Sequence, residues 1–189
     1  RCIEIEPRAA TFLLEMVENN TKQLQDTCEK LTLFFGEGSR ISHEDVEKIL
    51  YHSKEENVFT LFDKVAARDF PGSLEVLGKI LLSREADPVG LLAGLLAQVR
   101  KLKSLKELIE QRYSYEEAFS RVKMSSKRMQ RIYVEGCRRY SLDELKAIVL
   151  LIARFDYRVR SFKSNLHATL LQLFLYYLVV RGGSADFRF

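Results

Sequence analysis

The helix-start signals between residues 57 and 102 restrict most strongly how this chain can fold. Asn57, Pro71 and the pair Asp87-Pro88 mark three successive helix starts, because asparagine and aspartate cap helices and proline favours the first turn. Apolar residues follow the starts at helical spacing, and the inward-facing positions are Val58, Leu61, Phe62, Val65, Leu74, Leu77 and Leu81. The segment therefore predicts three consecutive helices, of which the third is long.

The composition favours an all-α fold. With 189 residues, 47% hydrophobic and 30% charged, the chain can form one or two domains and has neither a disordered nor a membrane-like composition. The three prolines, Pro7, Pro71 and Pro88, each lie just inside an expected helix start. The three cysteines are widely spaced and form no C-x-x-C pair, which argues against a disulfide framework or a zinc site.

The distribution of charge divides the chain near residue 56. Residues 1–56 hold 7 Lys and Arg against 12 Asp and Glu, whereas residues 57–189 hold 23 against 14. Such asymmetry is typical of two units with different surroundings. The acidic part is predicted to be a small domain of three short helices with marginal stability. The start signals of these helices are Pro7, Thr21 and the capping pair Ser42–Asp45.

The basic part, residues 57–181, is predicted to form a larger helical bundle. A capping box at Ser141 and Glu144 opens a long helix with a regular inward-facing apolar stripe. Residues 164–180 carry no charged side chain and are too few to span a membrane. A helix that is apolar all round must be covered on every side, so this one is a core helix, meets another subunit, or both. Residues 182–189 are expected to be a flexible tail.

Three consecutive motifs carry a resemblance to a known family. An N-x-F-x-L-x-D block beginning at Asn57 precedes a helix that ends in Leu-Leu and a helix that starts at Asp87-Pro88 and runs into Q-V-R. This order closely resembles the delta subunits of the bacterial DNA polymerase III clamp loader, over about residues 6–180. The resemblance implies that residues 1–56 are the three-helix lid-like domain of an AAA+-type module. It implies that residues 57–181 are the helical collar, the domain that associates clamp loader subunits into a ring.

Several positions depart from the family pattern. Thr27 and Cys28 stand where the family usually has a Glu-Leu pair, and Ser161 stands where a glycine commonly follows a basic residue. The run from 121 to 139 lacks the proline that the family often has there.

The function implied by the resemblance is that of a non-catalytic scaffold and assembly part of the delta subunit, serving sliding-clamp loading in DNA replication. The implied partners are the ATPase subunits and the delta prime subunit, bound through the collar. Contact with the sliding clamp is implied only through an N-terminal module outside this sequence, and a DNA contact in the full complex is left open. No membrane contact is implied, and the expected location is the bacterial cytoplasm.

The residues themselves predict no catalytic, cofactor-binding or metal-binding site. A nucleotide-binding loop requires G-x-x-x-x-G-K-[ST], and neither Gly36-Glu37-Gly38 nor Gly182-Gly183 has that pattern. His43, His52 and His167 have no second ligand at metal-binding spacing. The chain itself is therefore not expected to be an enzyme, although the delta subunits that it resembles belong to a nucleotidyltransferase holoenzyme.

Six residues are candidates for a subunit interface. Arg100, in Q-V-R, occupies a position that is usually basic in the family. Asp156 and Arg160 match its D-x-x-x-K/R pattern at a spacing that permits an i,i+4 ion pair. Exposed ion pairs add little stability, so specificity is the expected role. The other three candidates are Leu171, Leu175 and Leu178, which lie on the further apolar sides of the uncharged segment 164–180.

A basic run between residues 121 and 139 supports an alternative function. Clustered cations neutralise phosphates, and nearby tyrosines can stack on bases. The same run has an ordinary buried side, so a solvated basic face is the simpler interpretation. The alternative hypothesis is a free-standing basic helical module that binds nucleic acid without partners. Its candidate residues are Arg121, Lys123, Lys127, Arg128 and Arg131.

Overall fold

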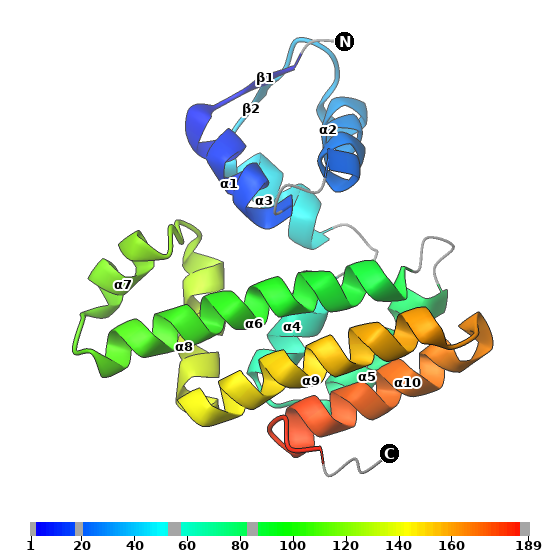
Figure 1. The fold of residues 1–189 in the computed structure, drawn as a ribbon. Helices are drawn as coiled ribbons and strands as arrows, with labels where there is room; N and C mark the ends of the chain where they lie inside the picture. The colour runs from blue at the N-terminus through cyan, green and yellow to red at the C-terminus, as the bar shows by residue number, and fades with distance from the viewer. Residues whose placement is uncertain (1–2, 18–20, 53–57, 83–86, 186–189) are drawn as a thin grey trace. The chain divides into compact units, whose positions relative to one another are not determined.

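The computed structural model describes four stretches of the chain, which are residues 3–17, 21–52, 58–82 and 87–185. The chain separates into two units, Arg1–Glu55 and Glu56–Phe189, at the position where the charge balance changes. Helices dominate both units (Figure 1), which confirms the all-α fold predicted from the sequence. Of the helices in the described part, none has the length and apolar character needed to span a bilayer.

The first unit combines three helices with a short pair of strands. Strands β1 (Glu4–Ile5) and β2 (Arg40–Ile41) pair in parallel. The start signals predict the helices, whereas a two-residue strand is too short for apolar alternation to reveal it. The helices are α1 (Pro7–Val17), α2 (Thr21–Phe35) and α3 (His43–His52).

The core of the first unit is small. Asp45 accepts hydrogen bonds from the amide and the hydroxyl of Ser42, at 3.1 and 2.6 Å, and this capping pair fixes the start of α3. The ring of His43 lies 4.5 Å from that of Phe12, between ring centroids. The buried apolar residues come from all three helices and β2, and they are Ala9, Phe12, Leu13, Leu31, Ile41 and Val46.

The second unit is a bundle of α-helices that ends in a π-helical turn. The α-helices are α4 (Val58–Ala66), α5 (Phe70–Leu82), α6 (Pro88–Glu110), α7 (Tyr115–Arg121), α8 (Lys127–Arg139), α9 (Leu142–Ser161) and α10 (His167–Leu175). A 3-10 turn, η1 (Ser164–Leu166), precedes α10, and the π-helical turn η2 (Tyr176–Val180) follows it.

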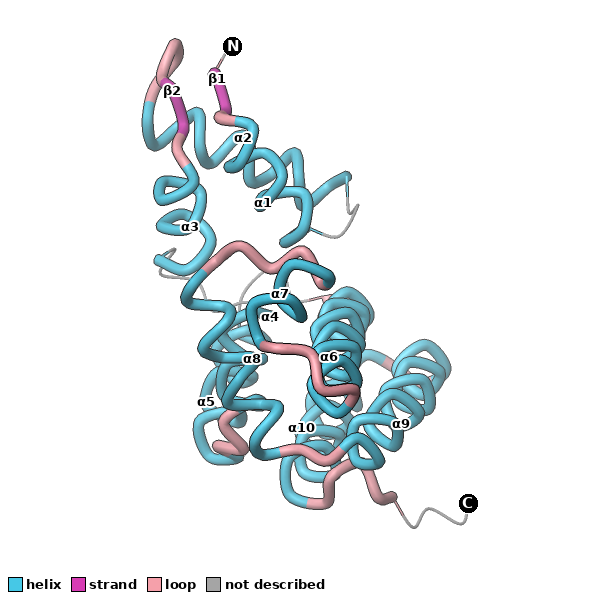
Figure 2. Tube along the Cα trace, turned by 90° about the vertical axis from the view of Figure 1, so that its left-hand side faces the viewer, coloured by secondary structure: helices cyan, strands magenta, loops and turns pink. Residues whose placement is uncertain are grey.

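Helices α6, α9 and α10 form one layer of this bundle, in which neighbours run antiparallel (Figure 1). Helices α4, α5 and α8 lie behind that layer, and the turned view of Figure 2 again places α6, α9 and α10 next to one another. The most extensive helix pairing is that of α6 with α9. The long helices of the second unit therefore determine its layered arrangement.

Capping side chains mark the helix starts that the sequence predicts. Asp87 accepts a hydrogen bond from the amide of Val89 (3.1 Å), with a proline in the first turn of α6. At α9, Ser141 and Glu144 exchange the reciprocal hydrogen bonds of a capping box, at 2.8 and 3.2 Å. Both predictions are confirmed. The cap expected at Asn57 lies outside the described residues.

Two buried tyrosines connect α8 to the helices around it. Tyr133 donates a hydrogen bond to Gln98 Oε1 on α6 (2.6 Å), and its ring lies 5.1 Å from that of Phe62 on α4. Tyr140, just after α8, donates to the Val65 carbonyl oxygen (2.8 Å). A buried hydroxyl without a partner would cost about 1–3 kcal/mol, so these two bonds favour this particular packing of α8.

The chain after η2 turns back onto the start of α9. Gly182 and Gly183 are buried with positive φ angles of 56° and 85°. The Gly183 amide donates to the Tyr177 carbonyl oxygen (2.9 Å), and a Cβ on Gly183 would lie 2.5 Å from the Ile148 nitrogen. The prediction of a flexible tail is therefore wrong for these two glycines, because they pack against α9. Residues 186–189 lie outside the described part.

Replacing Gly183 by alanine is expected to lower the free energy of unfolding by about 1–3 kcal/mol, because an L-residue is strained at this φ angle. Gly78→Ala is the matched control, since Gly78 lies in α5 with open space around it. Alanine there is expected to stabilise the fold by about 0.5–1 kcal/mol. Urea denaturation followed by circular dichroism measures both variants, and equal effects would contradict the packing of the tail on α9.

Candidate assembly surface

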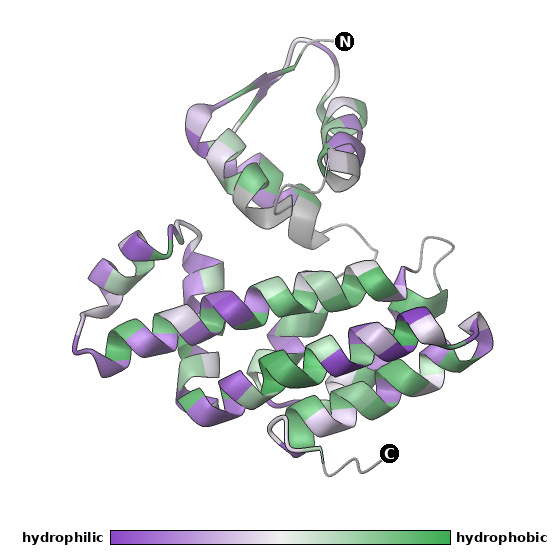
Figure 3. Cartoon of the chain, in the orientation of Figure 1, coloured by the Kyte–Doolittle hydropathy of each residue, from purple (hydrophilic) through white to green (hydrophobic). Residues whose placement is uncertain are grey.

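Three of the predicted interface residues, Leu171, Leu175 and Leu178, lie in the core of the second unit. Each is at most 1% exposed. Figure 3 shows the green of hydrophobic residues along most of α10. This helix packs against α5 and α9, and the ring centroids of Phe155 on α9 and Phe174 on α10 lie 5.4 Å apart. The prediction that these leucines contact another subunit is wrong, because helices of the same unit already cover them. One side of this segment is therefore core, as the core-helix interpretation predicts, whereas Leu173, Tyr176 and Val180 on its other side are exposed.

Other large apolar side chains between the start of α9 and the end of η2 are exposed instead. On α9, Leu150 is 63% exposed and Tyr157 is 73% exposed. They are seven residues apart, almost two helical turns, so they project from the same face. A helical wheel can find both from the sequence, since they fall outside the inward-facing stripe of the long helix. The other exposed members are Phe162, Leu166, Leu173, Tyr176 and Val180.

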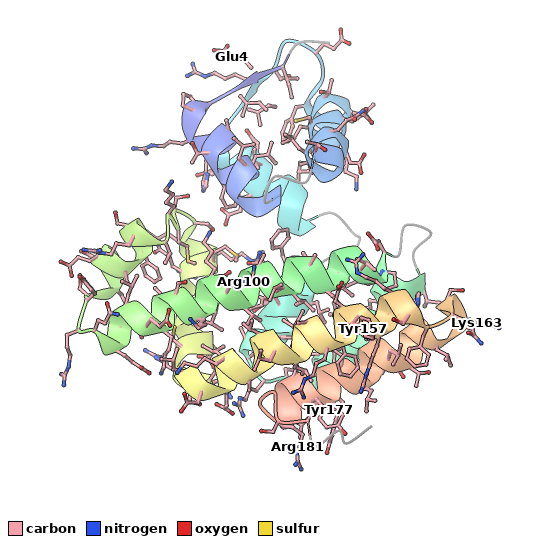
Figure 4. The ribbon with its side chains drawn as sticks, in the orientation of Figure 1. Glu4, Arg100, Tyr157, Lys163, Tyr177 and Arg181 are labelled. Atoms are coloured by element: carbon pink, nitrogen blue, oxygen red, sulfur yellow. The ribbon has the colours of Figure 1, made fainter. Side chains whose placement is uncertain are left out.

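The charged interface candidates lie at the surface of α6 and α9. Arg160 Nε donates a hydrogen bond to Asp156 Oδ2 (2.8 Å), so the predicted i,i+4 ion pair is present. This bond and the charge of Asp156 raise the pKa of Arg160. Arg100 is exposed and has no hydrogen bond or ion pair with any residue that the structure describes. Figure 4 labels Arg100 on α6 and Tyr157 on the neighbouring helix α9. Binding by these charged residues stays a prediction.

The nucleic-acid candidates are not equivalent in the structure. The guanidinium carbon of Arg121 lies 4.3 Å from the centroid of the Tyr113 ring, and Lys123 occupies a left-handed turn with a φ of 53°. Lys127 and Arg131 are exposed one turn apart on α8. Arg128 is half-buried, a little over a quarter turn from Lys127 around the helix. The structure therefore places Lys127 and Arg131 together on one open face, and their binding to nucleic acid stays a prediction.

A cluster around Arg68 joins the end of α4 to the start of α9. The Arg68 guanidinium lies over the Tyr140 ring, 4.3 Å from its centroid, and forms an ion pair with Glu144. Burial acts to raise the pKa of Glu144, but hydrogen bonds from Ser141 and Arg68 outweigh it and lower that pKa. Burial also raises the pKa of Tyr140. Near neutral pH the Tyr140 phenol is therefore neutral and the Glu144 carboxylate is charged. These are the protonation states that the hydrogen bond from Tyr140 and the ion pair with Arg68 need.

The cysteines of the described part behave as apolar groups. Burial raises the pKa of the Cys137 thiol to about 11, so this thiol is protonated at neutral pH and is a poor nucleophile. Burial raises the pKa of Cys28 as well. Among the described residues, no group of three or more His, Cys, Asp or Glu is arranged to hold a metal ion.

The second unit corresponds to a known protein family. The model of the DNA polymerase III delta subunit, C-terminal domain, matches residues 55–178. The chain belongs to the DNA polymerase III delta subunit family. The match runs from the last residue of the first unit into η2, so it includes α9, which carries Leu150 and Tyr157. The resemblance identified from the sequence motifs is confirmed.

Individual delta relatives match over more of the chain than the family model does. The DNA polymerase III subunit delta of Bacillus subtilis (strain 168) is 28% identical over 182 residues, which cover 96% of this chain and 52% of the relative. A probable delta subunit from Aquifex aeolicus (strain VF5) is 25% identical over 155 residues, which cover 82% of this chain and 44% of that protein.

A solved structure agrees with these relatives. The DNA clamp loader delta protein of Bacillus subtilis matches with a TM-score of 0.58 and 28% identity, over 94% of this chain and 51% of that one. The chain therefore spans about half the length of the relatives that it matches.

Leu175→Ala is expected to lower the free energy of unfolding by about 2–5 kcal/mol, as is usual for a buried leucine. Leu173→Ala removes the same atoms from a side chain that is 37% exposed, and a loss of about 1 kcal/mol or less is expected. Thermal and urea denaturation of the two variants measure the difference. Equal losses would contradict the placement of Leu175 in the core and of Leu173 at the surface.

Proposed function

We propose that this chain is a non-catalytic assembly part of a clamp loader delta subunit in bacterial DNA replication. The observation that carries the proposal is the delta family match over residues 55–178. Relatives named as delta subunits and as a clamp loader delta protein support it along almost the whole chain. Because the chain spans about half of those relatives, the proposal concerns one part of a larger subunit.

The two units take different roles in this proposal. The first unit, with its three short helices and small core, acts as the lid-like domain of an AAA+-type module. The second unit acts as the collar that holds the subunit in the clamp loader. Its long packed helices and the exposed Leu150 and Tyr157 support that role, because a rigid scaffold with apolar surface residues suits assembly.

The proposed partners are the ATPase subunits and the delta prime subunit of the clamp loader, and the proposed place of action is the bacterial cytoplasm. Contact with the sliding clamp belongs to a part of the delta subunit outside this chain. This chain carries no P-loop motif, and the proposal assigns it no ATP hydrolysis of its own.

Mixing the purified chain with the ATPase and delta prime subunits of the same bacterium tests the proposal. The chain is expected to co-elute with them on a sizing column, because the collar is the proposed assembly domain. Full-length delta from that bacterium is the positive control. Elution of the chain alone, under conditions in which full-length delta assembles, would contradict the proposal.

A second candidate function, nucleic-acid binding, rests on one face of α8. Lys127, Arg131 and Arg138 are exposed along this face, and none of them has an ion-pair partner among the described residues. Their spacings of four and seven residues bring all three to within about 40° around the helix. Unpaired cations in such a row can each neutralise a phosphate.

If this face binds nucleic acid, the isolated chain is expected to bind a labelled single strand with an affinity that falls steeply with salt. Lys127→Glu or Arg131→Glu should each reduce the slope of log K against log salt by about 1. Lys163→Glu, which changes an exposed cation beside η1, is the matched control. Fluorescence anisotropy across a salt series measures all three, and a single slope for every variant would exclude this use of α8.

A further inference from the structure

The outer surfaces of α6 and α9 adjoin, because the two helices pack along each other in antiparallel directions. Besides Asp156, the charge of Asp87 at the start of α6 contributes to raising the pKa of Arg160, near the end of α9, as expected when these two helix ends lie near each other. We call the outward-facing side of this pair the α6–α9 face. It consists of Ala93, Arg100, Leu150, Ala153, Arg154 and Tyr157, all of which are exposed.

The α6–α9 face includes two large apolar side chains. Leu150 and Tyr157 project from α9, and the alanine between them, Ala153, is small. Ala93 is the small residue on the side of α6, so Leu150 and Tyr157 stand above their surroundings. Exposed apolar groups of this kind mark binding surfaces, and tyrosine and arginine are enriched among residues that dominate binding energy.

The charges around the face select the kind of partner. Every carboxylate on α6 and α9 forms an ion pair within the unit, and the pairs are Lys103–Glu107, Lys106–Glu110, Lys146–Asp143, Arg68–Glu144 and Arg160–Asp156. Among the charged residues of these two helices, those with no ion pair to a described residue are Arg100, Lys101 and Arg154. All three are cations, so the unsatisfied charge on this pair of helices has one sign.

We infer that the α6–α9 face binds an acidic amphipathic helix of a neighbouring clamp loader subunit. This inference rests on the proposed function. Apolar side chains of the partner helix cover Leu150 and Tyr157, while its carboxylates meet the unpaired arginines Arg100 and Arg154. A second copy of this chain is a poor occupant, because two such faces would bring unpaired cations together. A bare phosphate chain is also a poor occupant, since it would leave Leu150 exposed.

The test uses the complete delta subunit that contains this chain, mixed with the purified ATPase and delta prime subunits. The double variant Leu150→Ser with Tyr157→Ser is expected to weaken assembly at least about tenfold, since exposed anchors dominate such interfaces. Arg154→Glu is expected to weaken assembly and to make it less sensitive to salt, because it removes an attractive charge. Biolayer interferometry at several salt concentrations measures both effects.

Two matched controls lie away from the face. Leu82→Ser changes an apolar side chain that is 88% exposed at the end of α5, and Lys163→Glu reverses an exposed cation beside η1. Both controls are expected to assemble with wild-type affinity. Since the face variants change exposed residues, their thermal unfolding should also match that of the wild type.

Each outcome decides between the two proposals. Failure of the wild-type subunit to assemble would contradict the proposed function itself. Assembly of the wild type together with face variants within twofold of its affinity would overturn only the inference about the α6–α9 face. If the face variants kept assembly but lost binding to a labelled single strand, the occupant would be nucleic acid and the inference would again be wrong.

Discussion

The packing of α6 against α9 is the interaction on which the second unit depends. These are its longest helices, with 23 and 20 residues, and each begins at a side-chain cap that defines where its buried face starts. On its other side α6 accepts the Tyr133 hydrogen bond from α8 and passes α4 at Gly94, where a Cβ would lie 3.0 Å from Val58. Because α6 touches both layers, a change in its position on α9 would disturb α4 and α8 as well.

Helix starts were predictable from the sequence because capping is local chemistry. Ser141 and Glu144 are three residues apart, and their hydrogen bonds need nothing from the rest of the fold. Local chemistry of this kind could not predict which side of α10 is buried. Leu173 and Leu175 are chemically identical and two residues apart, yet only Leu175 is buried, because the positions of α5 and α9 decide it. The two-residue strands and the packed Gly183 likewise depend on distant parts of the chain.

The candidate surface was predictable only where spacing along one helix was sufficient. The Asp156–Arg160 pair follows from an i,i+4 separation, and the structure contains it. Lys127 and Arg128 are neighbours in the sequence, yet α8 turns only the first fully to solvent, and this depends on which side of α8 faces α6 and α4. Composition therefore identified a basic run, while tertiary packing decides which of its cations a ligand can reach.

In this unit, exposed residues can be changed to test binding without lowering the stability of the fold, because the buried polar groups named above already have hydrogen-bond partners. The hydroxyls of Tyr133 and Tyr140 have buried acceptors, and the inward side of α10 packs against α5 and α9. Leu150 and Tyr157 contribute little to that interior, so the fold would tolerate polar residues in their place. A protein that only needed to fold would gain solubility from such replacements. Large apolar side chains on the same face as unpaired arginines are better explained by a partner that removes them from water than by the stability of the isolated chain.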